Sequence, residues 1–276
     1  MNKYRKAQRQ KHRKDKNIMK LLTWDINHSI IAFTTTRFDG FSKGSYQGLN
    51  LAFNVNDDHE TVLKNRIKLS EYLHTDLYHM ISPTQTHSTN FLEVTKKDGG
   101  KGMFSLEDAF YNYDGLYTKD SDVYLISYHA DCIPVLIYAE DKQIIGAIHS
   151  GWKGTVLQIV DKFIKHLIQK EAVNPDDIYA YIGPSLEQRN FEARDDIINL
   201  VKQMSFDTSN FYIKKDEDSY LLDGKGLVQQ QLLINGVKKE HITISPYCTI
   251  DNNDLFYSYR LNKLCGRNVT AIMRKK

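Results

Sequence analysis

Cysteine is scarce in this sequence of 276 residues, which contains only Cys132, Cys248 and Cys265. Three widely spaced cysteines cannot form the disulfide framework of a small secreted domain, and cytoplasmic redox chemistry would keep them reduced. We therefore expect free thiols, which are available as metal ligands or as nucleophiles.

Long hydrophobic runs are also missing. No stretch approaches the roughly 18 to 20 consecutive apolar residues that a membrane-spanning helix needs, and the N-terminus is polar and basic, unlike a secretory signal. We expect a cytoplasmic protein without a membrane partner. Hydrophobic residues make up 41% of the chain and charged residues 26%, so a sizeable globular core can form.

The motifs of the common nucleotide-binding folds are absent as well. The sequence has neither the Gly-rich dinucleotide fingerprint nor a Walker loop, and it shows no internal repeat. The sequence therefore gives no indication of a dinucleotide-binding, P-loop or repeat fold.

Basic charge is concentrated at the N-terminus. Residues 1–20 contain nine Lys or Arg and one Asp, a net charge of +8, whereas the whole chain carries +3, which leaves the remainder at −5. Nucleic-acid binding requires clustered basic residues, so we expect none on the folded body. The segment 1–20 is either a solvated, disordered tail or a contact for RNA or an anionic membrane.

Residues 21–276 are predicted to form a single catalytic domain, an α/β sandwich with mixed sheets. The β-branched segment 31–36 predicts a strand, and 39–45 predicts a glycine-containing loop. Apolar spacing predicts helices over 59–74 and 156–168. Further strands are expected at 91–94, 123–128, 133–138, 143–149, 178–182, 242–245, 255–259 and 269–273, and further helices near 192–204 and 224–235.

His87, Cys132 and His149 are the candidate metal ligands. Cys132 and His149 lie at the ends of neighbouring predicted strands, and His87 lies in a polar segment before an apolar one. Two imidazoles and one thiolate suit zinc, and three protein ligands leave a fourth position for water or substrate, as in catalytic zinc sites. We expect one zinc ion here, with copper as the alternative.

A cysteine hydrolase is the rival interpretation of the same residues. Cys132 can act as a nucleophile, with His149 or His87 as its base and Asp131 orienting that base. The spacing of these residues does not distinguish a metal centre from a hydrolase.

Several short motifs occur in one order along the chain. The most specific are Ala-Asp-Cys at 130–132 and His-Ser-Gly-Trp at 149–152. The others lie at 35–37, 49–51, 85–87, 182–184, 248–249, 256–260 and 266–267. Together they resemble the laccase-domain (YfiH-type) purine nucleoside phosphorylases, a family formerly labelled multicopper polyphenol oxidase, over residues 31–273.

The resemblance implies a single-domain α/β fold, a homodimer, and a metal held by His87, Cys132 and His149. It also implies phosphate-dependent cleavage of adenosine, inosine and methylthioadenosine to the free base and sugar 1-phosphate, together with adenosine deamination. The expected partners are therefore purine nucleosides and phosphate. Asp131 is the candidate proton carrier, so it joins Cys132 and Arg37 among the catalytic candidates.

Polar residues in the matching motifs are candidates for substrate contacts. Arg37 and Arg260 can fix phosphate or ribose oxygens, because a guanidinium presents a planar fork of donors, although each is equally suited to a structural ion pair. Gln85 and Asn50 can orient a ligand through hydrogen bonds or satisfy loop backbone. Trp152 can stack on a base or pack in the core.

The sequence departs from the family pattern in three places. Lys153, a further substrate-binding candidate, stands where Arg is common, and Lys does not reproduce bidentate recognition by Arg. Residues 186–190 replace a stretch that contains a cysteine, and Leu261 stands where a second Arg often follows the match to Arg260. These departures bear on substrate preference and phosphate affinity.

Three other functions stay open. A polyphenol oxidase would need several coppers and more His and Cys ligands than this site provides. An amide hydrolase that edits cell-wall precursors is a role also attached to the family. A metal-binding or RNA-associated module led by the basic tail would have no activity, so adenosine turnover would distinguish it from an enzyme.

Overall fold

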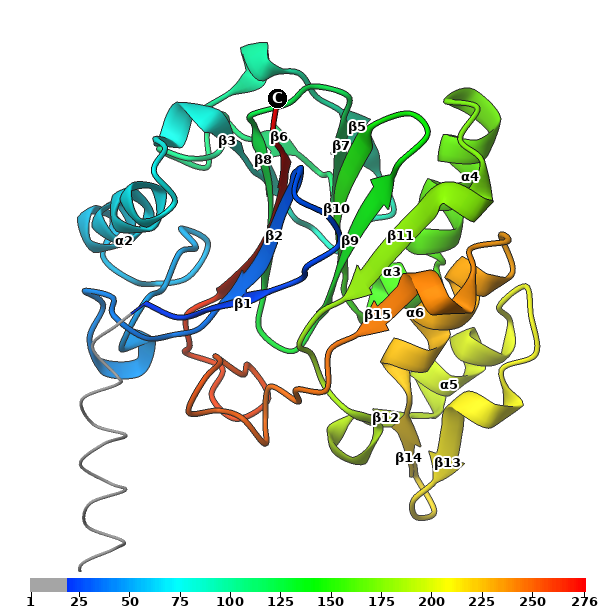
Figure 1. Cartoon of the computed structure of the whole chain (residues 1–276). Helices are drawn as coiled ribbons and strands as arrows, with labels where there is room; N and C mark the ends of the chain where they lie inside the picture. Colours follow the sequence, from blue (N-terminus) through cyan, green and yellow to red (C-terminus); the bar gives the residue numbers. More distant parts are fainter. Residues whose placement is uncertain (1–18) are drawn as a thin grey trace, which may run out of the picture.

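The computed structural model describes residues 19–276 and places two β-sheets face to face (Figure 1). The first sheet has the strand order β1 (Leu21–Thr23), β2 (Ile30–Thr35), β16 (Asn268–Arg274), β8 (Tyr124–His129) and β3 (Met80–Ile81). The second has the order β15 (Ile242–Ile244), β11 (Ile178–Ile182), β9 (Ile133–Ala139), β10 (Ile144–Ser150), β7 (Gly115–Thr118) and β5 (Phe91–Glu93). Both sheets are mixed, because β3 pairs with β8, β5 with β7 and β15 with β11 in parallel.

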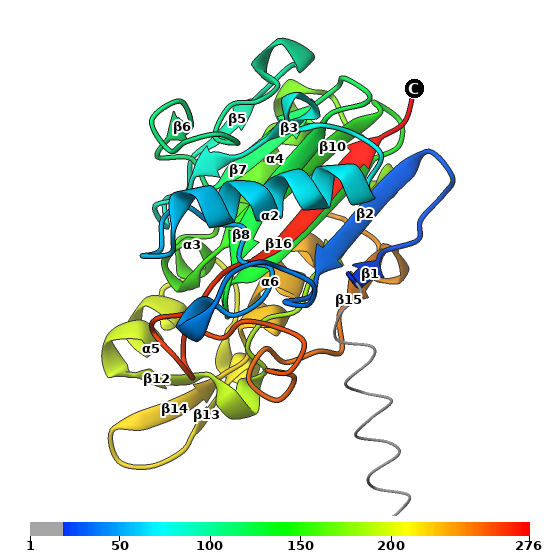
Figure 2. The same cartoon turned by 90° about the vertical axis from the view of Figure 1, so that its left-hand side faces the viewer.

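Helices cover the outer faces of both sheets, as two perpendicular views show (Figures 1 and 2). Helix α2 (His59–Tyr72) lies on the first sheet, where Leu69 joins the buried cluster under the helix. Helices α4 (Ile159–Lys170) and α6 (Gly224–Leu233) lie on the second sheet, where Phe163 is fully buried. The order of layers is therefore helix, sheet, sheet and helix, which confirms the predicted α/β sandwich with mixed sheets.

Alternation along strand β10 shows how the second sheet carries a functional side chain inward. Ile144 and Ile148 belong to the core beneath α4, whereas Ile145 and Ala147 belong to the core between the sheets. Successive side chains of a strand point to opposite faces. His149 therefore points to the same inter-sheet face as Ala147. It is a buried polar side chain that follows the apolar Ile145 and Ala147 along that face.

A third sheet adjoins the sandwich and consists of β12 (Glu192–Arg194), β14 (Ser219–Leu222) and β13 (Tyr212–Lys214). It shares a hydrophobic cluster with α3 (Trp152–Val156) and α5 (Asp195–Lys202).

The remaining elements are short. Strands β4 (Pro83–Thr84) and β6 (Phe110–Tyr111) form a short parallel pair. The 3-10 helices are η2 (Gly44–Tyr46), η3 (Leu77–His79), η4 (Lys96–Asp98), η5 (Pro175–Asp177), η6 (Gln188–Asn190), η7 (Ser209–Phe211) and η8 (Lys239–His241).

The predicted strands and helices are confirmed except in three places. Residues 255–259 form a turn instead of a strand; the apolar pattern there reflects burial of Phe256 and Tyr257, whose N–H groups donate to the oxygens of Asn252 and Asn268. The helix predicted at 192–204 begins only after strand β12. The helix predicted over 156–168 is split at Gln158, whose φ of +61° is left-handed.

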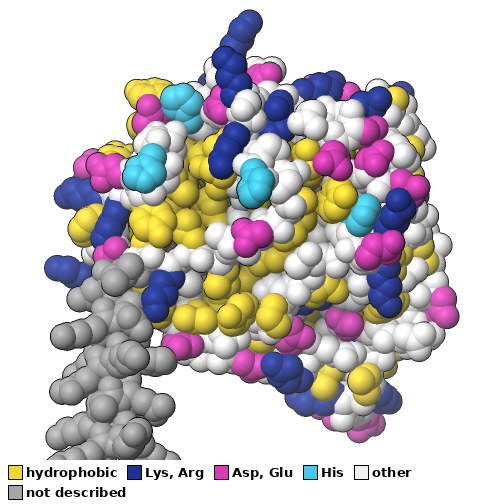
Figure 3. All heavy atoms as spheres, in the orientation of Figure 1, with side chains coloured by type: hydrophobic (Ala, Val, Ile, Leu, Met, Phe, Trp, Pro, Cys, Tyr) yellow, Lys and Arg dark blue, Asp and Glu magenta, His cyan; other side chains and the backbone are white. Residues whose placement is uncertain are grey.

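The predicted basic tail, residues 1–20, lies outside the described residues except for Met19 and Lys20, and its proposed contacts with RNA or a membrane therefore stay predictions. Met19 is buried in the cluster beneath α2. In the part of the chain that is described, no helix is long and apolar enough to cross a membrane. On the face drawn in Figure 3, Lys and Arg are interspersed with Asp and Glu, and hydrophobic side chains gather around the edge strands β1 and β15.

Candidate metal centre

The side chains of His87, Cys132 and His149 meet in the structure, and we call them the ligand triad. One ligand atom from each lies within 4.8 Å of the others. His87 comes from the loop between β4 and β5, Cys132 from the turn between β8 and β9, and His149 from β10. Antiparallel pairing of β9 with β10 sets His149 opposite Pro134, two residues beyond Cys132. The predicted convergence of these strand ends is therefore present.

Two residues at this site have a left-handed backbone conformation that favours glycine. The φ angles are +62° at His87 and +85° at Asp131. Such conformations cost about 1 to 3 kcal/mol and persist only where the surroundings hold them. The buried carboxylate of Asp114 holds the first, because it accepts hydrogen bonds from the backbone N–H groups of residues 86–88.

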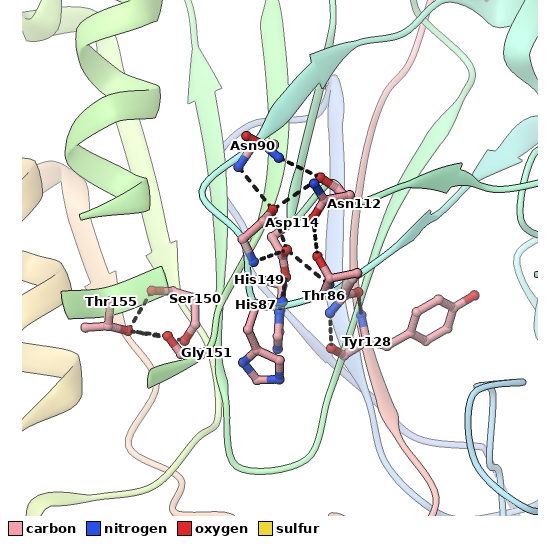
Figure 4. A network of polar contacts seen from close by, with 12 residues as sticks. Thr86, His87, Asn90, Asn112, Asp114, Tyr128, His149, Ser150, Gly151 and Thr155 are labelled. Atoms are coloured by element: carbon pink, nitrogen blue, oxygen red, sulfur yellow. Dashed lines mark hydrogen bonds and ion pairs between the residues drawn. The ribbon is translucent and has the colours of Figure 1, made fainter. Parts of the chain in front are cut away.

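Asp114 also connects the two histidines of the ligand triad (Figure 4). Its Oδ1 accepts a 2.7 Å hydrogen bond from Nδ1 of His149 and a 3.1 Å bond from the backbone N–H of His87. Burial opposes ionisation of Asp114, but hydrogen bonds from His149 and Ser88 outweigh it and hold the pKa of the carboxyl below its usual value. Because Nδ1 of His149 is engaged, Nε2 remains for a metal.

The two histidines of the ligand triad have opposite pKa shifts. Burial and the nearby positive charge of His149 lower the pKa of His87 to about 4, so its imidazole is neutral at neutral pH, the form that binds metals. Burial also lowers the pKa of His149, but the sulfur of Cys132 and the carboxylate of Asp114 favour its charged form and raise the pKa to about 9. His149 must therefore lose a proton when a metal binds.

The donor set fits a zinc-type ion on two observations of the structure. Nδ1 of His87 is buried and has no hydrogen-bond partner among residues 19–276, which is costly for a polar atom unless a ligand compensates. Gly151 leaves room for this ring, because a Cβ at that position would lie 2.1 Å from Nδ1 of His87. Two nitrogen donors and one sulfur donor are borderline-soft ligands of the kind that zinc prefers.

The ligand triad lies in a cavity of about 630 Å³, a size typical of sites for small molecules. Part of its lining is apolar and part is cationic. The apolar and aromatic lining residues include Tyr128, Ile133, Trp152, Leu186, Phe191, Ile197 and Tyr259, and the cationic ones are Arg260, Lys263 and Arg267. The cavity therefore suits a ligand with a flat apolar part and an anionic part.

Four further residues named in the sequence analysis also line this cavity: Gln85, Asp131, Trp152 and Arg260. Gln85 uses its amide on the backbone of Tyr128, with both hydrogen bonds at 2.7 Å, and so steadies the cavity wall. The carboxylate of Asp131 accepts one hydrogen bond from the Thr249 hydroxyl and one from the backbone N–H of Arg260, each 2.6 Å long. Asp131 thereby ties a distant loop to the turn that carries Cys132.

Arg37, Asn50 and Lys153 do not line the cavity, and their expected contacts with substrate stay predictions. The guanidinium of Arg37 donates to the backbone carbonyls of Asn253 and Gln47 and packs on Tyr257. Two of its nitrogens hold loops together, which is the structural alternative that the sequence left open.

Asn50 and Lys153 differ in why they are outside the cavity. Asn50 is fully buried, and its amide bonds Asp57, the backbone of Ala52 and the backbone N–H of Arg267. It therefore positions Arg267, a cavity residue, from behind. The ammonium of Lys153 is exposed and lies 5.5 Å from the ring centroid of Trp152.

Sequence reasoning missed Asp114 and assigned no role to Arg267 or Lys263. Asp114 immediately precedes the apolar strand β7, and an acidic residue at the start of a buried strand is the signal that would have singled it out. Arg267 lies in a matching motif at 266–267 without an assigned contact. Lys263 lies in a loop without periodicity, so only its position in space identifies it.

Known proteins share the fold and much of the sequence. The purine nucleoside phosphorylase YlmD of Bacillus subtilis (strain 168) is 35% identical over 251 residues, which cover 91% of this chain and 90% of that protein. The crystal structure of the hypothetical protein YfiH of Bacillus licheniformis matches with a TM-score of 0.90 and 31% identity, covering 92% of this chain and 96% of that one. The crystal structure of YlmD from Geobacillus stearothermophilus matches with a TM-score of 0.88 and 31% identity. The match covers 90% of this chain and 93% of that one.

The family resemblance is confirmed by a family-wide sequence model. The model of the family described as multi-copper polyphenol oxidoreductase laccase matches residues 31–275, which include the whole ligand triad. The match spans most of the chain, and the relatives cover nearly all of it. This chain therefore belongs to the multi-copper polyphenol oxidoreductase laccase family.

Proposed function

We propose that this protein is a zinc-dependent purine nucleoside phosphorylase. It converts adenosine, inosine and methylthioadenosine, with phosphate, to the free base and a pentose 1-phosphate, and it also deaminates adenosine. The observation that carries the proposal is a group of three metal-ligand side chains in a cavity with apolar and cationic lining. Relatives named purine nucleoside phosphorylase support it, including the one from Bacillus subtilis.

The metal would be held by His87, Cys132 and His149. When bound, a zinc ion supplies Lewis-acid stabilisation of developing negative charge and lowers the pKa of water. Copper is the alternative ion for this donor set. A multicopper oxidase needs further ligand groups, and within residues 19–276 the ligand triad is the one group of His, Cys, Asp or Glu side chains arranged to hold a metal.

The chain's own residues bind and orient the substrate. Trp152 and Phe191 offer flat apolar surfaces in the cavity for a purine. Asp114 fixes the ring of His149 and thereby the position of one metal donor. Asp131 is the candidate proton carrier, because its carboxylate lines the cavity and keeps lone pairs beyond the two hydrogen bonds that it accepts. Arg260 offers guanidinium donors for phosphate or ribose oxygens.

Product analysis tests both activities. We expect zinc-analysed protein to convert adenosine with phosphate to adenine and ribose 1-phosphate, and to form inosine from adenosine when phosphate is omitted. The C132A variant should lose both zinc and turnover, because it lacks one of three donors. Nucleoside turnover by metal-free C132A would contradict the proposal, and so would the absence of base release from all three nucleosides by zinc-loaded wild type.

Amide hydrolysis by a cysteine nucleophile is a second candidate because of one geometric feature. His149 lies between Cys132, a partner in the ligand triad, and the buried carboxylate of Asp114, which orients it at 2.7 Å. This is the order of nucleophile, base and orienting acid in cysteine hydrolases, with Asp114 in the role first given to Asp131. Covalent labelling of Cys132 by an acylating amide analogue in metal-free protein, together with its turnover, would favour this candidate.

A further inference from the structure

Three cationic side chains from the segment 260–267 line the cavity without an acidic partner among residues 19–276. Arg260, Lys263 and Arg267 line the cavity, and none of them forms an ion pair with any of residues 19–276. The only carboxylate in the lining is that of Asp131. Three unpaired cations against one carboxylate leave the cavity with an excess of positive charge, which attracts anions.

Both arginines are anchored yet keep free donors. The Nη2 of Arg260 donates to the backbone carbonyl of Glu192, and the Nη1 of Arg267 donates to the carbonyls of Cys265 and Gly266. These bonds use one nitrogen of each guanidinium. The other N–H groups have no partner in the described chain, so each arginine is held in position with donors to spare.

The backbone around these side chains is anchored at both ends of a short loop. The N–H of Arg260 donates to Asp131 at 2.6 Å, and the N–H of Arg267 donates to the buried amide of Asn50 at 3.0 Å. Asp131 directly precedes Cys132 in the sequence, so the first anchor ties the loop to the ligand triad. Arg267 and His87 line the same cavity. The cations therefore lie beside the metal site.

Lys263 is the third cation that this segment of the chain brings to the cavity. It lies three residues beyond Arg260 and lines the cavity, whereas Leu261 between them is 54% exposed and outside the lining.

We propose that Arg260, Lys263 and Arg267 form the subsite for inorganic phosphate, and that Lys263 determines its affinity. The inference rests on the proposed phosphorolysis. There, a phosphate oxygen forms a bond to C1′ of the ribose while the bond from C1′ to N9 breaks; the electron pair leaves with the purine, which takes up a proton. The three cations hold the phosphate for this attack, while Phe191 and Ile197 on the apolar part of the lining contact the nucleoside.

Calorimetric titration of the zinc-loaded holoprotein with inorganic phosphate, at fixed ionic strength, tests the subsite without any turnover. We expect K263M to weaken phosphate binding about tenfold, the effect of losing one charge-assisted hydrogen bond, and K263R to recover most of it. The control is K239M, which removes an exposed lysine outside the cavity lining. Equal phosphate affinity in K263M, K239M and wild type would overturn the proposal.

Steady-state kinetics then separate this inference from the proposed function. In K263M the KM for phosphate should rise about tenfold, whereas kcat at saturating phosphate and the KM for adenosine should stay within about twofold. If phosphate binds through Lys263 but no nucleoside is cleaved, the proposed function fails and the subsite stands. If K263M weakens binding of adenosine 5′-monophosphate but not of inorganic phosphate, the subsite holds the phosphate group of a nucleotide and the proposal is wrong.

Discussion

The cavity of the ligand triad and a second hollow are both lined by arginine side chains, and they differ in what those side chains contact. In the cavity of the ligand triad, Arg260 and Arg267 keep unengaged donors. The other hollow, of about 870 Å³, is lined by residues 37–44, 47–48 and 253–254, and we call it the Arg37 hollow. There the guanidinium of Arg37 donates to two backbone carbonyls at 3.1 and 3.2 Å and packs on Tyr257.

The difference teaches that volume and charge alone do not identify a binding site. The Arg37 hollow is larger than the cavity, but it also contains acidic side chains, and Asp39 pairs there with Lys68. Arg37 uses two of its guanidinium nitrogens on loop carbonyls, whereas Arg260 and Arg267 each use one nitrogen and keep the other two for a ligand. The cavity adds a second feature that the Arg37 hollow lacks, a ligand triad on strained and well-supported backbone.

The largest expected effect concerns the space beside His87. We expect G151A to weaken zinc binding more than about 100-fold, because the added methyl group would lie 2.1 Å from Nδ1 of His87 and must displace that ligand. G154A is the matched control, since its methyl group would meet the nearest atoms at 3.4 Å, an ordinary contact. Zinc content after dialysis against a competing chelator measures both. Equal zinc affinity in G151A and G154A would contradict the placement of His87.

The next effect concerns the support of His149. D114N should weaken zinc binding about 10- to 100-fold, because the amide no longer presents a charged acceptor to Nδ1 of His149. Zinc affinity is measured with a competing chelator, and circular dichroism checks that the variant folds. A folded D114N protein that binds zinc as tightly as wild type would show that Asp114 supports only the loop at 86–88.

A matched pair of arginine variants tests the comparison itself. R260M should raise the KM for phosphate about tenfold and leave the free energy of unfolding within about 0.5 kcal/mol of wild type. R37M should do the opposite: it should lower the free energy of unfolding by about 1 kcal/mol, because two hydrogen bonds to loop carbonyls are lost, and leave the KM for phosphate unchanged. The reverse pattern would locate phosphate binding in the Arg37 hollow.

Acid sensitivity should also differ between the two hollows, because the cavity contains buried histidines and the lining of the Arg37 hollow contains none. Burial, with the charges of His149 and Arg267, lowers the pKa of His129 from 6.5 to about 3. Its neutral form is favoured in the folded state, so its contribution to stability is present above pH 6.5 and is lost as the pH falls toward 3.

Denaturant unfolding of metal-free protein between pH 6 and pH 4 measures this loss. H129Q should flatten the decline in the free energy of unfolding by about 1.4 kcal/mol per pH unit relative to wild type. Glutamine can still donate to the Thr270 hydroxyl, which lies 2.8 Å from Nε2 of His129. An unchanged slope in H129Q would mean that His129 does not titrate differently in the folded and unfolded states.

Local patterns predicted most of the secondary structure. The strands around Cys132 and the helix that contains Phe163 follow from runs of β-branched residues and from 3.6-residue spacing, which depend on neighbours in the sequence. Two of the three failures have the same cause. At 255–259 and at Gln158, contacts with distant residues override the local preference, since Asn268 takes the N–H of Tyr257 and Ser205 donates to the side chain of Gln158.

The sequence by itself predicted an α/β sandwich with mixed sheets, the family and the three side chains of the ligand triad, because hydrophobic periodicity, motif order and ligand chemistry depend on residue types. Only the tertiary structure decided which polar residues serve the cavity. It brought in Asp114 and Lys263 and left Arg37 outside. The physical reason is competition for hydrogen bonds: whether a side chain keeps free donors depends on acceptors that lie far away in the sequence.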